Sequence, residues 1–134
     1  MIVVDANVLI YFWLPDTLSP IAKACHAKDP DWAAPLLWRS EFCNVLAHYL
    51  RKNLLNMAAA KAAYQNAELT LRKQEYAMTV EEVLAIIVRS NCSSYDCEYV
   101  ALAQRLGVKL VTKDAKLIKQ FPGVAIDLDV FAKS

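Results

Sequence analysis

Residues 93–114, SSYDCEYVALAQRLGVKLVTKD, contain a helix pattern that is followed at once by a short strand pattern. Ser93 and Ser94 are typical helix-starting residues, and Gly107 has the position of a glycine that ends a helix. The apolar run from Lys109 to Thr112 predicts a buried strand. Helices placed between strands indicate crossover connections and therefore a parallel sheet.

Strand and helix patterns alternate along the rest of the chain as well. The expected strands cover residues 2–4, 32–34 and 124–128, and the expected helices cover residues 19–28, 37–52, 56–74, 80–89 and 115–120. Phe12 and Trp13 are assigned to a loop after the first strand, either in the core or in an apolar patch for a partner. The fold class is therefore α/β, with a mainly parallel sheet covered on both faces and a projecting helical hairpin.

The composition is that of a folded protein with one core. Of the 134 residues, 57% are hydrophobic and 22% are charged, which excludes intrinsic disorder. We expect residues 1–134 to form a single domain, because two cores are hard to build from a chain of this length. The net charge of +1 argues against a general electrostatic nucleic-acid binder.

The N-terminus and the cysteines predict a soluble cytoplasmic protein. Met1–Asp5 has no basic region that would begin a signal peptide, and the longest strongly apolar run, Val83–Val88, is too short for a membrane span. His26 and His48 are expected to be structural or exposed. No zinc site is expected, because the cysteines form no C-x-x-C pair and only these two histidines could join them as ligands. Four cysteines without a C-x-x-C pair are typical of small buried residues in a reducing compartment: Cys25, Cys43, Cys92 and Cys97.

Four acidic residues fall where they can reach one end of the predicted sheet. Asp5 ends the first strand, Asp114 follows a later strand, and Asp96 lies in the first turn of a helix. Glu41 lies in the first turns of another helix on an apolar flank, where a carboxylate costs free energy unless it is paired or bound to a cation. Ligands of open parallel sheets bind beyond the carboxyl ends of the strands, so we expect these carboxylates to converge there.

Converging carboxylates need a proton or a cation between them. Two of them about 4 Å apart repel by roughly 4 kcal/mol at an effective dielectric of ~20. Oxygen ligands without histidine or thiol suit Mg²⁺ or Mn²⁺, and such a centre is well matched to phosphodiester hydrolysis. Taken singly, Asp96 and Asp114 are equally well explained as helix-dipole or capping residues. Asn7 and Thr112 are either turn formers or residues that orient a carboxylate.

Four stretches together resemble the acidic motifs of PIN-domain ribonucleases and, within that family, of VapC-type toxins from toxin–antitoxin pairs. In family order they are Val3–Asn7 (VVDAN), Trp38–Glu41 (WRSE), Tyr95–Ala103 (YDCEYVALA) and Leu110–Asp114 (LVTKD). The resemblance implies a three-layer α/β/α sandwich with four to five strands and a Mg²⁺- or Mn²⁺-dependent endoribonuclease. It also implies a homodimer and an antitoxin partner that covers the active site.

The resemblance further implies roles for individual residues. The catalytic positions are filled by Asp5, Glu41, Asp96 and Asp114, with Asn7 and Thr112 as supports. Asp5, Asp96 and Asp114 are the expected metal ligands, and Glu41 is expected to orient or deprotonate the attacking water. Tyr95 and Tyr99 are expected to pack in the fold rather than to stack on bases.

Basic residues close to these acids are candidates for holding an RNA backbone. Lys113, Lys116 and Lys119 lie close to Asp114, the last of the four acids, and Arg39 lies close to Glu41. The alternatives are a solvated helix face for the lysines and a surface ion pair for Arg39. Lys116 stands where some family members carry a further acid, which favours one tightly held metal ion.

Three other functions remain open at this point. PIN domains also serve in RNA processing, so the nuclease need not be a toxin. A phosphohydrolase could use Asp5 as its nucleophile, although Asn7 replaces the second aspartate usual in such sites. A binding module that has lost its activity is the third possibility, against which the four intact acids argue.

Overall fold

The computed structural model describes residues 1–134, and at its centre lies a five-stranded sheet. All four strand pairs are parallel, in the order β3-β2-β1-β4-β5. The strands are β1 (Ile2–Val4), β2 (Trp32–Pro35), β3 (Glu75–Tyr76), β4 (Leu110–Thr112) and β5 (Ala125–Asp127). The expected parallel sheet is thus confirmed, at the upper end of the expected number of strands.

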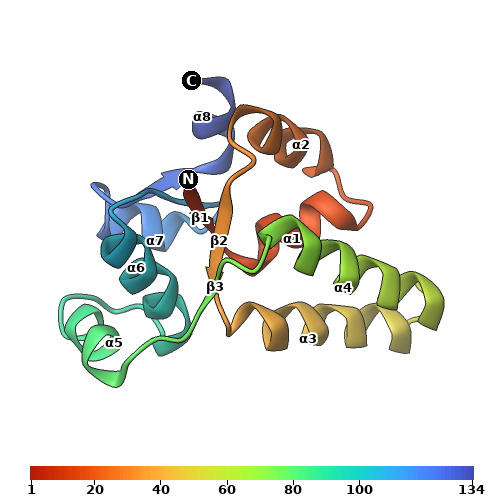
Figure 1. The fold of residues 1–134 in the computed structure, drawn as a ribbon, viewed down its shortest axis with the longest axis horizontal. Coiled ribbons are helices and arrows are strands. Elements are labelled where there is room, and N and C mark those ends of the chain that lie inside the picture. Colours follow the sequence, from red (N-terminus) through yellow and green to blue (C-terminus); the bar gives the residue numbers. More distant parts are fainter.

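Helices cover both faces of this sheet. They are α1 (Ala6–Trp13), α2 (Ser19–Lys28), α3 (Trp38–Arg51), α4 (Met57–Leu71), α5 (Val80–Ile87), α6 (Ser94–Leu106), α7 (Ala115–Gln120) and α8 (Leu128–Lys133). In the view of Figure 1, α5, α6 and α7 lie to the left of the sheet, and α1 to α4 lie to its right. The long helices α3 and α4 run side by side and project from the body as the expected hairpin.

Side-chain caps explain why several helices begin where the sequence predicts. Asn56 accepts a hydrogen bond from the amide of Ala59 and opens α4. Thr79 forms a reciprocal capping box with Glu82 at the start of α5. At the far end of α6, Gly107 has a φ of 67°, the left-handed conformation in which glycine ends helices.

The predicted loop after β1 is wrong, because residues 6–13 form the helix α1. Asp5 caps this helix, and its apolar side chains Val8, Leu9 and Ile10 are buried. Phe12 and Trp13 are half-buried on it and pack against the core. The sequence ANVLIYFW is rich in β-branched and aromatic residues, so burial rather than helix propensity stabilises α1.

Two other short elements are absent from the sequence-based expectations, and α4 is shorter than expected. Strand β3 has two residues and forms by pairing with β2, which a sequence pattern of that length does not signal. Helix α4 ends at Leu71 rather than near Gln74, because Arg72 and Lys73 adopt left-handed backbone conformations. Helix α8 begins where Asp127 caps the amides of residues 129 and 130.

The core joins the sheet to the helices around it. A single cluster of 32 buried hydrophobic residues includes all three residues of β1, together with Trp32 of β2 and Trp38 of α3. Trp38 stacks on Tyr64 of α4 with ring centroids 5.3 Å apart, which holds the base of the hairpin together. No helix of the structure has the length and apolar character that a membrane crossing requires.

The strand order creates a crevice between β1 and β4. From β1 the chain proceeds to β2 and β3 on one side, whereas β4 and β5 lie on the other side of β1. The helices that connect β1, β2 and β3 therefore lie on one face of the sheet, and the helices that connect β3, β4 and β5 lie on the opposite face (Figure 1). This reversal leaves space beyond the carboxyl ends of β1 and β4, where side chains from both halves can meet.

Candidate active site

An acidic pocket of about 220 Å³ occupies the crevice between β1 and β4. Its lining residues are Asp5, Ala6, Asn7, Glu41, Asn44, Val45, Asp96, Tyr99 and Asp114. All four acids singled out in the sequence therefore lie around one pocket, although they come from four separate parts of the chain. We call this the acidic pocket below.

Asp5 lies at the base of the acidic pocket, where β1 passes into α1. Its Oδ1 accepts a hydrogen bond of 3.1 Å from the amide of Val8, and its Oδ2 accepts one from the hydroxyl of Thr112. Burial raises the pKa of Asp5 from 3.8 to about 6, and the charges of Glu41 and Asp96 add to the increase. Neutral donors thus fix the Asp5 carboxylate in place, while burial makes its ionised form unfavourable.

Thr112 connects two of the acids from a fully buried position at the end of β4. Its hydroxyl donates to Asp5 and accepts a 3.0 Å hydrogen bond from the amide of Asp114. Asp114 in turn caps α7, accepting from the amides of Lys116 at 2.9 Å and Leu117 at 3.3 Å. Asp114 is therefore a capping residue and a pocket residue at once, so the two interpretations of its sequence position do not compete.

Asp96 reaches the acidic pocket from the first turn of α6. Its amide donates to the capping hydroxyl of Ser93 at 3.1 Å, and its side chain lines the pocket. Burial raises the pKa of Asp96, the charge of Asp114 raises it further, and Lys116 lowers it. The electrostatic coupling shows that Asp96, Asp114 and Lys116 share one local environment.

Glu41 enters the acidic pocket from α3 and is held by a residue that its sequence position assigns to packing. The hydroxyl of Tyr99 donates a 2.6 Å hydrogen bond to Oε1 of Glu41. Burial raises the pKa of Glu41, while this hydrogen bond lowers it. Tyr99 and Asn44 both line the pocket without having been predicted to do so. Each lies three residues after a predicted acid on its own helix, a spacing that places both residues on the same helix face.

The acidic pocket offers only oxygen and amide groups to a ligand. Asn7 lines it with an exposed side chain that forms no hydrogen bond within the chain. The carboxylates stand around the pocket without forming a group of three or more side chains that could hold a metal ion. An all-oxygen set of like charges is nevertheless the donor chemistry that a hard divalent cation prefers.

Arg39, a candidate RNA contact, does not line the acidic pocket and forms ion pairs outside it. Its guanidinium donates to both carboxylate oxygens of Glu75, at 2.7 Å and 2.9 Å, and pairs with Glu68 at 3.0 Å. It also donates to the Tyr64 hydroxyl at 3.0 Å. The ion pairs of the alternative interpretation are thus present, and Arg39 joins β3 to the α3–α4 hairpin.

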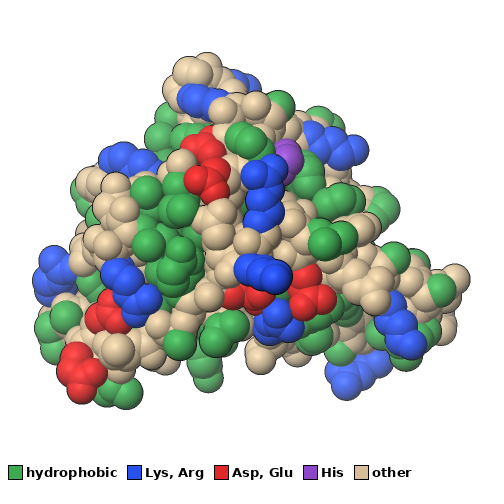
Figure 2. Space-filling model, in the orientation of Figure 1, with side chains coloured by type: hydrophobic (Ala, Val, Ile, Leu, Met, Phe, Trp, Pro, Cys, Tyr) green, Lys and Arg blue, Asp and Glu red, His purple; other side chains and the backbone are tan.

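The three lysines close to Asp114 in the sequence differ in their availability to a ligand. Lys113 pairs with Asp127 at 3.0 Å and Asp129 at 3.6 Å. Lys116 is exposed, and its ammonium donates to the carbonyl of Asn91 at 2.6 Å. Lys119 is exposed and has no hydrogen-bonded partner. Figure 2 shows basic side chains interspersed with acidic and apolar ones on the face that it draws, so this face has no continuous basic band.

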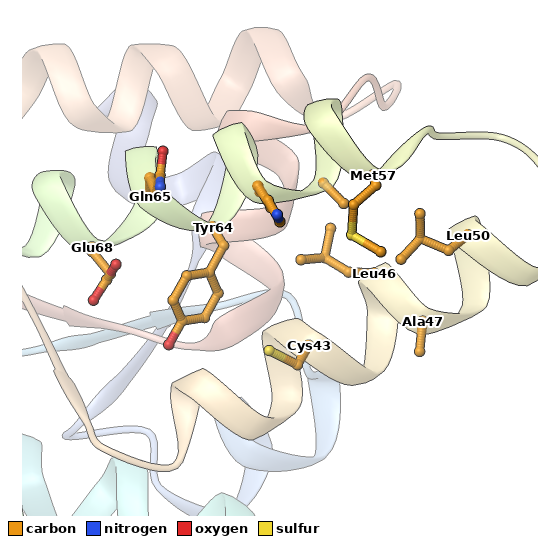
Figure 3. Close-up of a pocket in the computed structure, with 10 residues that line it drawn as sticks. Cys43, Leu46, Ala47, Leu50, Met57, Tyr64, Gln65 and Glu68 are labelled. Atoms are coloured by element: carbon orange, nitrogen blue, oxygen red, sulfur yellow. The ribbon is translucent and has the colours of Figure 1, made fainter.

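A second pocket lies between α3 and α4 and differs from the acidic pocket in character. It has a volume of about 440 Å³, and its walls include Leu46, Leu50, Met57 and Tyr64 (Figure 3). Although larger, it contains one carboxylate, Glu68, and thus lacks the clustered acids that chemistry on a phosphodiester needs. We refer to it below as the hairpin groove.

Comparison of the sequence with known families gives one match that spans most of the chain. The sequence pattern of the PIN domain matches residues 2–123. The curated protein Ribonuclease VapC3 from Pyrobaculum aerophilum is 28% identical over 128 residues, which cover 92% of this chain and 96% of that protein.

Solved structures share the fold at low sequence identity. The crystal structure of PAE2754 from Pyrobaculum aerophilum has a TM-score of 0.76 and 24% identity, covering 98% of this chain and 93% of that one. A toxin–antitoxin complex from Klebsiella pneumoniae has a TM-score of 0.65 and 18% identity, with 96% and 98% covered. The expected PIN-like α/β fold is confirmed by these structures.

Proposed function

We propose that this chain, which belongs to the PIN-domain family, is a metal-dependent endoribonuclease with the acidic pocket as its active site. The observation that carries the proposal is the meeting of Asp5, Glu41, Asp96 and Asp114 around one pocket beside β1 and β4. The similarity to a ribonuclease over nearly the whole chain supports RNA as the substrate. Clustered acids, three of which are half-buried, are unfavourable for folding alone, which supports a role in binding or chemistry.

The metal proposed for this site is Mg²⁺ or Mn²⁺, held by Asp5, Asp96 and Asp114. When bound, such an ion would lower the pKa of a water molecule and neutralise charge on the phosphate. The raised pKa values of Asp5 and Asp96 support the assignment, because both carboxylates lie close to other negative charges that a dication would offset. One tightly held ion fits this chain, since a lysine, Lys116, and not a further acid stands two residues after Asp114.

The remaining side chains have proposed roles in positioning and proton transfer. Glu41 is not among the proposed ligands, and its Oε2 forms no hydrogen bond within the chain, so it is the candidate to orient or deprotonate the attacking water. Thr112 orients Asp5 through its buried hydroxyl. Contacts with the phosphate backbone are assigned to Asn7, which lines the acidic pocket, and to the exposed Lys116 of α7. The reaction is an in-line displacement at phosphorus.

Cleavage of RNA by the partner-free protein tests this proposal. We expect single-stranded RNA to be cut in the presence of Mn²⁺, with no cutting when EDTA is added. Asp5→Asn should reduce the rate by a factor of about 100 or more, because loss of a residue that only orients a metal ligand already costs about 10- to 100-fold. Equal cleavage by Asp5→Asn and the parent protein would contradict the proposal, and trapping of an aspartyl-phosphate at Asp5 would favour the phosphohydrolase instead.

The proposed biological role is that of a toxin whose partner is an antitoxin protein, with the toxin acting as a homodimer. A distantly similar fold occurs in a toxin–antitoxin complex, and the hairpin groove provides an apolar surface for a partner segment. The non-toxin alternative, an RNA-processing nuclease, needs no such partner. The product of an adjacent small gene is the candidate for co-purification.

A substitution in the hairpin groove tests this partner assignment. Met57 is 59% exposed at the first position of α4, where an aspartate is compatible with the helix. We expect Met57→Asp to abolish co-purification with the adjacent gene product and to leave RNA cleavage unchanged. Unimpaired binding of the adjacent gene product by Met57→Asp would show that the hairpin groove is not its binding surface. The matched control is Leu69→Asp, at an exposed position of α4 outside the groove.

A further inference from the structure

Tyr99 is a buried residue whose only polar side-chain atom is directed at the acidic pocket. Its side chain is 2% exposed, and its hydroxyl donates to Oε1 of Glu41 at 2.6 Å. Buried tyrosines usually satisfy their hydroxyl with a nearby partner, most often one that serves only the fold. Here the partner is a carboxylate of the proposed active site, contributed by a different helix 58 residues away in the sequence.

The Glu41 carboxylate needs such a partner if it is to have a defined position. Glutamate has three rotatable side-chain bonds, and the charge of Asp96 disfavours its ionised form in the pocket. Glu41 has no other side-chain hydrogen bond and no ion pair. The Tyr99 hydroxyl is therefore the one group of the chain that holds this carboxylate.

Tyr99 itself has little freedom to move. It belongs to α6, which packs on β1, β2 and β4. Its ring is enclosed by the core cluster, of which it is a member. It also lies three residues after Asp96, so the same face of α6 supplies both a proposed metal ligand and the donor to Glu41.

We infer that Tyr99 is a positioning residue of the proposed nuclease, which fixes Oε1 of Glu41 so that Oε2 faces the attacking water. This inference rests on the proposed function, because it assigns to Tyr99 an effect on catalysis through Glu41 alone. In the proposed active site, Tyr99 contacts neither the substrate nor the metal. Its hydroxyl keeps the base in one orientation before the substrate arrives.

The test is a double-mutant cycle on the full chain. Tyr99→Phe removes only the hydroxyl, and we expect it to lower kcat for single-stranded RNA with Mn²⁺ by a factor of about 10 to 100, leaving KM within about twofold. In a Glu41→Gln background, Tyr99→Phe should change the cleavage rate, measured in single turnovers with excess enzyme, by less than about twofold. Mn²⁺ binding by calorimetry should be unchanged in Tyr99→Phe.

Two tyrosine controls separate this effect from the loss of any hydroxyl. Tyr95 lies on the same helix, is 60% exposed and has no hydrogen bond, so Tyr95→Phe should match the parent protein throughout. Tyr64 accepts a hydrogen bond from Arg39 outside the pocket, so Tyr64→Phe should leave kcat unchanged even where it lowers the melting temperature.

Each other outcome overturns the inference or the function beneath it. Parent-like kcat in Tyr99→Phe, or an equal loss in both backgrounds, shows that Tyr99 does not act through Glu41. Loss of Mn²⁺ binding or of the cooperative thermal transition in Tyr99→Phe assigns the residue to the fold. If Asp5→Asn cleaves as fast as the parent protein, the proposed function fails; if only Tyr99→Phe is parent-like, the function stands and the inference alone is lost.

Discussion

Single residues in the acidic pocket serve the fold and the site together. Asp5 caps α1, Asp114 caps α7, and the hydroxyl of Thr112 lies between them. Capping fixes each carboxylate relative to its helix, so the position of the proposed ligands follows from local backbone structure. At Asp5 the same arrangement places a negative charge where desolvation disfavours it, which opposes folding when nothing neutralises the charge.

We predict that neutralising Asp5 stabilises the protein when no metal is present. Since one pKa unit corresponds to about 1.4 kcal/mol, the shift from 3.8 to about 6 makes the ionised carboxylate unfavourable by up to about 3 kcal/mol at high pH. Asp5→Asn retains an oxygen that can cap α1. In EDTA at about pH 8, its free energy of unfolding should exceed that of the parent protein.

The pH dependence of this difference provides the check. The pKa of Asp5 is higher in the folded than in the unfolded protein. Its ionised carboxylate therefore lowers the free energy of unfolding increasingly as the pH rises from about 4 to about 6. Below this window the effect is absent, and above it the effect is constant. Urea unfolding of both proteins at several pH values measures the difference. Glu81→Gln, at an exposed position, is the control, and an advantage of Asp5→Asn that is equal at pH 4 and pH 8 would contradict the electrostatic cause.

At the scale of elements, the caps made much of the secondary structure predictable. The starts of α4, α5 and α6 follow from Asn56, Thr79 and Ser93, because a cap is a local interaction between residues a few positions apart. Helix α1 and strand β3 are not evident from short-range patterns in this way. The first is stabilised by the burial of its apolar face, and the second by pairing with β2 at the edge of the sheet.

The glycine that ends α6 permits a matched prediction about helix termination. Gly107 has a φ of 67° and Gly123 has none in the left-handed region, while an added Cβ meets no atom within 4 Å at either position. Gly107→Ala should therefore lower the free energy of unfolding by about 1 to 2 kcal/mol through backbone strain alone. Gly123→Ala should be neutral or stabilising by about 0.5 kcal/mol.

Urea midpoints of the two alanine variants measure this difference. RNA cleavage should be unchanged in both, because neither glycine lines the acidic pocket. Equal midpoints would show that the chain after α6 adjusts its backbone without strain, which contradicts the predicted role of Gly107.

At the scale of the whole molecule, the charge balance takes on a different meaning. The net charge of +1 is the sum of 15 basic and 14 acidic side chains, and four of these acids lie around one pocket. Arg39 and Lys113 are engaged in ion pairs, which leaves Lys116 and Lys119 as exposed cations on α7, the helix that Asp114 caps. We therefore expect RNA to be held through few backbone contacts.

The salt dependence of RNA binding tests this expectation. In a Glu41→Gln background with Mg²⁺, the logarithm of the binding constant should fall with the logarithm of salt concentration with a slope no steeper than about −2. Lys116→Ala should make that slope shallower by about 0.7, the value for one contact to a single strand. Lys23→Ala, on the exposed surface of α2, should leave it unchanged, and a slope steeper than about −4 would indicate a wider basic surface.

The sequence alone determined the α/β class, the parallel sheet and the identity of the four acids. These follow from short-range patterns: apolar runs, caps and the residues that end strands. Only the tertiary structure decided which side chains meet. The Thr112–Asp5 bond joins residues 107 positions apart, and the Tyr99–Glu41 bond joins residues 58 positions apart. The pairing of Arg39 with Glu75 likewise joins residues that are far apart in the sequence. Such contacts depend on how the helices pack on the sheet, and packing is a property of the whole chain.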